Sequence, residues 1–449
     1  MQKLLQQINL NTLLKYSVAT LLIVIPMYPK FPIFNIPGTY VAVRVEDFII
    51  SILLVLIGIY FLKNKEDFIK DKTNQAIILY ILAGLLSILS AVVITKTVVS
   101  HIAIFHWARR IEYLIPFFVA IAASRTGRDT KFFVITLLTS AVVAFLYGLG
   151  QIHLHWPVIS TQNEEYARGV ALRWVPGSRL HSTFSGHYDL AGFLVLVFPI
   201  AISMFFYLKK NINRILFTLL IIFPLFWTFL QTEARVSFVA YLFGTAITLW
   251  FLQKKIFIVP VVLISFVGMM VFSSLGARYM RTINIYKDKL LNEQIIIKKV
   301  YAFEDNRVLN QNPSEGPIIE DRSFAIRLNV EWPRAIRAFS KNPLLGTGYS
   351  SIGLAADNDY IRLLSEVGIL GTLAFLIIIM RIGSKLVNYA KNSKGHTIER
   401  FYVIGFLGSL VAILTNAIFI DVFEASKIAI IFWTLAGIAY GISTNKNNA

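Results

Sequence analysis

The chain contains no cysteine, and this absence excludes disulfide bonds, thiolate catalysis and cysteine metal sites. Charge is scarce as well, since Asp, Glu, Lys and Arg make up only 15% of the 449 residues. By contrast, 56% of the residues are hydrophobic and the mean hydropathy is +0.65. No small-residue cleavage site follows the first apolar run, so we expect no cleavable signal peptide. This composition indicates a membrane protein rather than a soluble domain.

Long apolar runs repeat along the chain from Leu10 to Ile442. Each has roughly 16 to 22 residues, enough for a helix to cross a hydrocarbon core of about 30 Å. Inside a bilayer the backbone must satisfy its own hydrogen bonds, so such runs form helices. We predict an all-α integral membrane protein with about twelve transmembrane helices, at 10–27, 47–62, 75–94, 104–123, 131–150, 187–207, 214–231, 236–252, 256–275, 367–388, 401–420 and 427–442.

One polar stretch, 276–366, interrupts these runs and divides the chain into three parts. Residues 1–275 hold the first nine predicted helices, with an outer loop at about 151–186. Residues 276–366 form a large, partly helical loop, and residues 367–449 hold the last three helices. Within the loop, the apolar spacing of 324–339 predicts an amphipathic helix at the membrane surface.

The formal net charge is +18, and its distribution decides what it means. With the N-terminus in the cytoplasm, the predicted inner segments hold twenty basic residues and five acidic ones. The positive-inside rule produces this asymmetry. The basic excess is therefore a topology signal and does not indicate nucleic-acid binding, and the large loop is expected on the extracytoplasmic side.

Charged residues near membrane depth are the first candidates for function, because their burial is costly. Arg109, Arg110 and Glu112 lie in the predicted fourth helix, either as a functional cluster or as partners in an internal ion pair. Glu46 and Asp47 open the second helix, where carboxylates complement the helix N-terminus. We interpret this acidic pair as structural.

Arg235 follows Glu233 in a short predicted turn between two helices, so its guanidinium is expected at the outer membrane boundary. A guanidinium presents a planar fork of donors that suits phosphate oxygens. The alternative is an arginine that pairs with Glu233 or with a lipid headgroup.

The large loop contains a second cluster, with Arg322 and Arg327 before the amphipathic stretch and Asp357, Asn358 and Tyr360 after it. A carboxylate beside a helix that re-enters the membrane is a candidate general base. The alternative is that Asp357 or Asp359 only caps this helix.

A third element runs from Arg179 to Gly192 and contains His181, His187 and Asp189. The two histidines lack the close ligand spacing typical of a metal site, so we expect no metal there.

These motifs, in this order, resemble the O-antigen ligase and O-antigen polymerase superfamily of bacterial membrane glycosyltransferases. The resemblance rests on the Arg179–Gly192 element, the Thr232–Ser237 turn, and a block from Arg327 to Gly371. That block holds Trp332, a Pro-Leu-Leu-Gly-Thr-Gly turn, Asn358-x-Tyr360 and Glu366-x-Gly368-x-x-Gly371. The long loop before the last three helices also fits.

The resemblance implies a metal-independent enzyme of the bacterial inner membrane, with no cofactor and with its active site on the extracytoplasmic side. Its partners would be an undecaprenyl-pyrophosphate-linked glycan as donor, a glycan or lipid acceptor, and the surrounding lipid. Arg235 and Arg327 would hold the pyrophosphate, and Asp357 stands where related ligases carry a histidine that activates the acceptor. Arg179, Arg322, Asn358, Tyr360 and His187 would bind substrate. The departure at Asp357 leaves ligase and polymerase both open.

Two other classes remain as alternatives. A transporter or flippase of lipid-linked glycans also has about twelve helices, but it typically carries polar groups near the midplane and two related halves. A protein oligosaccharyltransferase typically carries an acidic metal-binding motif early in the chain, and the region near Asp47 shows none.

Overall fold

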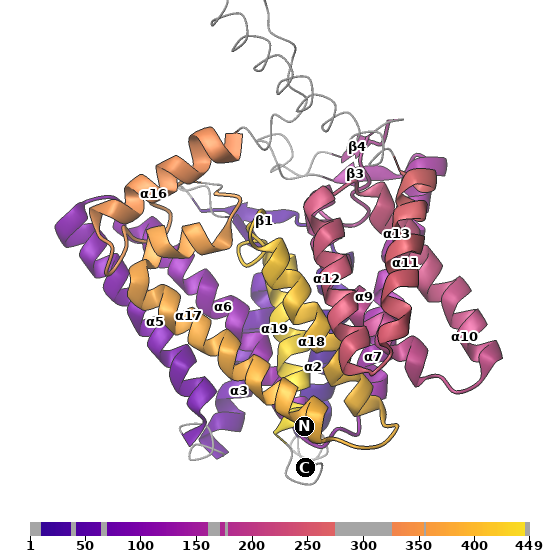
Figure 1. The fold of residues 1–449 in the computed structure, drawn as a ribbon. Coiled ribbons are helices and arrows are strands. Elements are labelled where there is room, and N and C mark those ends of the chain that lie inside the picture. The colour runs from indigo at the N-terminus through magenta and orange to yellow at the C-terminus, as the bar shows by residue number, and fades with distance from the viewer. Residues whose placement is uncertain are drawn as a thin grey trace, which may run out of the picture.

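The computed structural model describes residues 10–36, 42–63, 70–159, 171–175, 178–273, 326–353 and 356–444. Helices dominate these residues, with two small strand pairs (Figure 1). In chain order the elements are α2 (Leu10–Met27), β1 (Pro32–Asn35), β2 (Ala42–Arg44), α3 (Val45–Lys63), α5 (Lys72–Ser90), η1 (Ala91–Thr95), α6 (Ser100–Ser124), α7 (Thr130–His153), β3 (Pro157–Ile159), β4 (Ala171–Arg173), α9 (His187–Tyr207), α10 (Asn211–Phe217), η2 (Thr218–Ile222), α11 (Phe223–Gln231), α12 (Arg235–Phe251), η3 (Lys255–Phe257), α13 (Ile258–Phe272), η4 (Arg327–Glu331), α16 (Trp332–Lys341), α17 (Asp359–Asn392), α18 (Ile398–Asn416) and α19 (Ser426–Ser443).

The predicted class, an all-helical membrane protein, is confirmed. Among the described residues, ten helices are long and apolar enough to cross a bilayer. Two more occupy predicted runs without meeting both conditions, because α12 has only 17 residues and α6 carries Arg109, Arg110 and Glu112. The count of twelve spans therefore remains a prediction.

The helices at the centre of the bundle are α9, α18 and α19. In α19 94% of the apolar window is buried and in α9 83%, compared with 17% in the peripheral segment that contains α13. Figure 1 shows α18 and α19 in the middle of the bundle, with other helices on both sides. The exposed valines and phenylalanines of α13 suit a helix that faces lipid.

Successive helices run in opposite directions, so the helix ends lie at two opposite ends of the bundle (Figure 1). At one pole the Thr183 hydroxyl donates to the Pro26 carbonyl at 2.7 Å, and the Ser426 hydroxyl donates to Glu46 at 2.7 Å. We call this end the site pole; it also carries α16 and the strand pairs (Figure 1). At the other end, the basic pole, Lys15 pairs with Asp129 at 2.6 Å. The helix ends predicted to lie outside thus share the site pole.

Two short antiparallel strand pairs were not predicted. Strand β1 pairs with β2, and β3 pairs with β4. Each has three or four residues, too few for the alternation that makes a strand recognisable in sequence.

The predicted boundary between the large loop and the tenth helix, at 366–367, falls inside a longer helical element. Helix α17 already begins at Asp359, because the Asn358 side chain accepts hydrogen bonds from the Tyr360 and Ile361 N–H groups. Gly368 then interrupts the helix with φ 64° and ψ −169°. The last residues of the predicted loop are therefore a short helix, and the predicted start at 367 coincides with this kink.

The kink is held by the Pro-Leu-Leu-Gly-Thr-Gly turn. The Ile369 N–H donates to the Pro343 carbonyl at 2.9 Å, and the Gly348 N–H donates to the Glu366 carbonyl at 2.9 Å. A Cβ atom on Gly368 would lie 2.4 Å from the Leu344 carbonyl oxygen. The Pro-Leu-Leu-Gly-Thr-Gly turn and the Glu366-x-Gly368 motif are thus packed backbone against backbone. Glycine is needed at 368 for the positive φ and because a side chain would not fit.

Gly368→Ala is expected to lower the free energy of unfolding by about 2–4 kcal/mol, from left-handed strain and overpacking against Leu344. Gly383→Ala is the control on the same helix, since its Cβ would meet Leu410 at an ordinary 3.7 Å. Thermal unfolding of the purified protein in detergent measures both. Equal stability of the two variants would contradict this account of the kink.

Candidate functional site

Asp421, between α18 and α19, organises the segment that leads into α17. Its Oδ2 atom accepts hydrogen bonds from the Ala356 and Asp357 N–H groups at 3.0 and 3.1 Å. Its Oδ1 atom accepts one from the Asn358 N–H at 3.0 Å. A single carboxylate therefore fixes three consecutive peptide groups.

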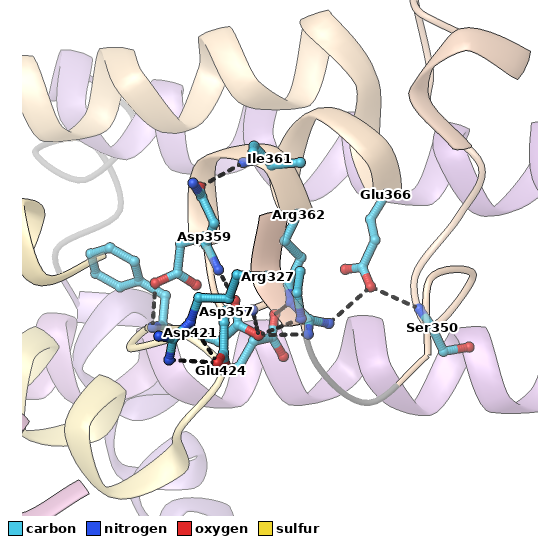
Figure 2. Close-up of polar contacts among 12 residues, drawn as sticks. Arg327, Ser350, Asp357, Asp359, Ile361, Arg362, Glu366, Asp421 and Glu424 are labelled. Atoms are coloured by element: carbon cyan, nitrogen blue, oxygen red, sulfur yellow. Dashed lines mark hydrogen bonds and ion pairs between the residues drawn. The ribbon is translucent and has the colours of Figure 1, made fainter. Parts of the chain in front are cut away.

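Arg362, on the first turns of α17, neutralises Asp421. Its Nη2 atom lies 2.8 Å from Asp421 Oδ2, and its Nη1 atom lies 3.3 Å from Glu366 Oε1 (Figure 2). Burial alone would raise the pKa of Asp421, but Arg362 and the backbone N–H groups outweigh it and hold the pKa below its usual value. The carboxylate is therefore ionised at neutral pH.

Arg110 of α6 extends the charge network. It pairs with Glu424 and lies 3.7 Å from Glu366 Oε2, and it donates to the Phe423 carbonyl at 3.2 Å. The network thus connects α6, α17 and the segment before α19. For Arg110, the interpretation as an internal ion pair is confirmed.

Arg327 and Asp357 form an ion pair in which only the acid is substantially exposed. Arg327 Nε and Nη2 lie 2.9 and 2.7 Å from Asp357 Oδ2 (Figure 2). The Arg327 side chain is 7% exposed, whereas that of Asp357 is 34% exposed. Burial and the nearby Asp421 raise the pKa of Asp357 above its usual value, although Arg327 opposes them. The pair is thus half-open, with the acid facing outward.

The first residues of α9 lie between Arg327 and Arg179, another of the arginines predicted to bind substrate. Arg327 lies close to the Tyr188 side chain. The ring of Tyr188 lies 4.0 Å from that of His187, and Arg179 Nη1 donates to His187 Nε2 at 2.8 Å. The structure therefore brings together two segments far apart in the chain.

Arg235 joins the same region through its own turn. It is the first residue of α12, half-buried, and follows Glu233, whose Oε2 atom lies 4.0 Å from Arg179 Nε. Its predicted place in a tight turn is confirmed, since Glu233 has φ 52°. Arg322 lies outside the described residues.

Asn358 and Tyr360 were predicted to bind substrate, but both side chains form hydrogen bonds to backbone groups of the protein. Asn358 is buried and caps α17, while the Tyr360 hydroxyl donates to the Leu414 carbonyl at 2.8 Å. The capping role considered for Asp357 or Asp359 therefore belongs to Asn358. Asp359 instead accepts a hydrogen bond from the Phe423 N–H at 3.2 Å.

His181 stacks on His187 with ring centroids 5.9 Å apart. Burial lowers the pKa of His181, so its imidazole is neutral at pH 7. Among the residues that the structure describes, no three His, Asp or Glu side chains are grouped to hold a metal ion.

Further charged pairs lie beside this region. Arg109 Nη2 lies 3.2 Å from Asp47 Oδ2, and Lys30 Nζ lies 3.4 Å from Asp189 Oδ2. Lys427 of α19 is buried and donates to the Thr183 carbonyl at 2.9 Å. These contacts join the segment after α2 to α9, α3 to α6, and α19 to the segment before α9. The structural interpretation of Asp47 agrees with them.

Sequence reasoning missed Asp421, Arg362, Glu424 and Lys427. A usable signal was present, since all four stand at or near the ends of predicted apolar runs. Arg362 and Glu366 also have the i, i+4 spacing of a helical ion pair. The criterion used for Arg109 and Asp47 would have identified them.

The fold and this charged pole define a multi-pass helical membrane protein with a polar site at one membrane boundary. Residues 220–376 match the protein family described as O-antigen ligase, and this match confirms the resemblance to the O-antigen ligase and polymerase superfamily over that segment. Arg235, Arg327 and Asp357 all lie inside it. The comparison with curated proteins gives no match.

Asp421→Asn is expected to destabilise the protein by about 3–5 kcal/mol at pH 7, because the buried Arg362 loses the closest of its charged partners. The folded-state pKa of Asp421 is lowered, so its contribution is present above the unfolded value of about 3.9 and is lost as the pH falls through the folded value. Thermal unfolding against pH measures this.

Asp129→Asn is the matched control, since Asp129 forms a more exposed pair with Lys15 at the basic pole and its loss is expected to cost at most about 1 kcal/mol. A loss for Asp421→Asn no greater than that of the control would reject the organising role of Asp421.

Proposed function

We propose that this protein transfers a glycan from an undecaprenyl-pyrophosphate carrier to a hydroxyl group of a glycan or lipid acceptor. The reaction would take place at the extracytoplasmic face of the bacterial inner membrane. The observation that carries the proposal is the half-open Arg327–Asp357 pair, which lies in the segment that matches the O-antigen ligase family.

Arg327 and Arg235 hold the pyrophosphate in this proposal. Glycosyl transfer leaves negative charge on the departing pyrophosphate, and fixed cations in a site with little water stabilise that charge strongly. Arg327 has the required immobility, because Asp357 and Tyr188 orient it and its side chain is buried. Arg179, which lies against His187 and Glu233, extends the cationic surface toward Arg235.

Asp357 acts as the general base. When the pyrophosphate binds Arg327 it replaces the Asp357 carboxylate, which then turns to the acceptor. The acceptor oxygen forms the new bond to the anomeric carbon, the bond from that carbon to the phosphate oxygen breaks, and the hydroxyl proton passes to Asp357. A pKa raised by burial brings this carboxylate closer to the operating pH, where a base works best.

Asn358 and Tyr360 serve as positioning residues in this scheme. Their hydrogen bonds to α17 and α18 fix the backbone on either side of Asp359, and with it the place of Asp357. The backbone at 356–358, which carries the base, is therefore fixed, so substrate binding has to move only side chains there.

Arg235→Lys and Arg327→Lys keep the charge but lose the planar fork, so each is expected to lower the transfer rate at least about tenfold. Arg337→Lys, on the exposed face of α16, is the control and is expected to have no effect. The assay follows glycan transfer in membranes that contain each variant at equal level. Full activity of both the Lys and Ala variants at either position would remove that arginine from the site.

Asp357→Asn is expected to fold, to bind the lipid-linked donor, and to lose roughly 10²–10⁴-fold in turnover, as for other removed general bases. The wild-type rate should fall as the pH drops through the raised pKa of Asp357, because the protonated acid is no base. Gel ladders and mass spectrometry of the products provide the measurement. They also distinguish a polymerase, which extends lipid-linked repeats, from a ligase, which moves one glycan to a new acceptor.

Glu331→Gln is a nearby control that removes a carboxylate outside the Arg327–Asp357 pair. Turnover of Asp357→Asn close to that of the wild type would exclude Asp357 as the base and would direct attention to Asp359 or Glu366.

A further inference from the structure

A groove of about 540 Å³ opens at the basic pole, far from the site described above. It lies between the start of α5, the last third of α17 and the end of α19, three elements that Figure 1 shows near one another. Its lining residues are Lys70, Asp71, Lys72, Thr73, Arg381, Ser384, Lys385, Asn388 and Tyr440. The proposed glycosyl transfer uses none of them.

The groove has a strong positive charge balance. Four of its lining residues are cationic and one is acidic. Among the described residues, Lys72, Arg381 and Lys385 form no ion pair with a carboxylate, and all three are exposed. Arg381 and Lys385 lie four residues apart on α17 and therefore on one helix face.

The single acid of the groove, Asp71, is already occupied. Its Oδ1 atom accepts hydrogen bonds from the Thr73 and Asn74 N–H groups at 2.7 and 3.3 Å. The buried Tyr440 hydroxyl donates to Asp71 at 3.0 Å. Asp71 and Tyr440 thus form a fixed polar base of the groove, and Lys72, Arg381 and Lys385 can bind an anion from outside.

The groove lies at the depth of a lipid headgroup. Lys72 is the first residue of the segment made of α5 and η1, which runs for 24 residues to Thr95. This length corresponds to roughly 36 Å along a helix, enough to cross a hydrocarbon core of about 30 Å. Apolar side chains continue from the groove toward the midplane, since Ile78 and Leu79 of α5 and Met380 of α17 are 43%, 53% and 60% exposed. Acyl chains suit that surface.

We propose that this groove binds the phosphate of an anionic phospholipid, with Arg381 and Lys385 on one side of the phosphate and Lys72 on the other. An arginine fork matches phosphate oxygens, and basic pockets between transmembrane helices recognise anionic headgroups. The adjoining apolar surface favours a lipid over free phosphate as the source of this anion. The proposal does not depend on the glycosyl transfer.

The test titrates the purified full-length protein in detergent with phosphatidylglycerol, with phosphatidylcholine of the same acyl chains, and with inorganic phosphate, and detects bound lipid by native mass spectrometry. Arg381→Gln with Lys385→Gln is expected to weaken phosphatidylglycerol binding roughly 10- to 30-fold. Lys391→Gln with Lys394→Gln removes the same charge from exposed positions outside the groove and is expected to leave binding unchanged.

Because all four substituted residues are exposed, both double variants are expected to unfold at the wild-type temperature. Equal binding of phosphatidylcholine and phosphatidylglycerol, or equal weakening in the two double variants, would overturn the proposal. Displacement of the lipid by millimolar inorganic phosphate would assign the groove to a soluble anion and would also overturn it.

Discussion

The geometry of the site pole depends on one carboxylate, that of Asp421. It holds the three N–H groups of 356–358 and the Arg362 guanidinium at the same time. Asp357 has φ 48°, a left-handed conformation that aspartate tolerates better than most residues and that the Asp421 contacts stabilise. The direction of the Asp357 side chain toward Arg327 follows from this fixed backbone. A contact between the segment before α19 and the segment before α17 thus sets the position of the proposed base.

Charge burial at the site pole is tolerated because almost every ion described there has a partner of opposite sign. Arg362 lies between Asp421 and Glu366, and Arg110 lies between Glu366 and Glu424. Such pairs are expensive to desolvate and gain little net stability, but removal of one partner is costly. Arg327 and Asp357 differ from the deeper pairs, because Asp357 is one-third exposed and a substrate anion can replace it. The buried network of Arg362 and Arg110 therefore holds the structure together. In the outer pair, Arg327 can exchange Asp357 for a substrate anion.

Much of the fold could be predicted from the sequence, because a membrane imposes a length and an apolar composition on each span. The helices predicted at 10–27 and 187–207 have the bounds of α2 and α9. Apart from the run at 367–388, the other runs differ from the observed elements by at most four residues at either end. The kink at Gly368 and the hairpins β1–β2 and β3–β4 depend on tertiary contacts and leave little periodic signal. The early start of α17 had a local sign, the Asn358 cap, which was interpreted as a binding residue.

The site was predictable only in part, for a similar reason. Arg327 and Asp357 stand 30 residues apart and were selected by a motif, and the structure brings them into contact. Asp421 and Arg362 are separated by 59 residues, and nothing in the spacing of either predicts the other. Long-range ion pairs require the three-dimensional arrangement of α17, α18 and α19. A search for charges at every helix end, on the physical ground that such charges need partners, would have identified their members without pairing them.

The central claim, that a pyrophosphate takes the place of Asp357 on Arg327, is tested most directly by an experimental structure with a polyprenyl-pyrophosphate bound. The account predicts phosphate oxygens within hydrogen-bond distance of Arg327 and Arg235, and an Asp357 carboxylate that has left Arg327 while Asp421 still holds the 356–358 backbone. A pyrophosphate bound elsewhere, with the Arg327–Asp357 pair intact, would contradict it.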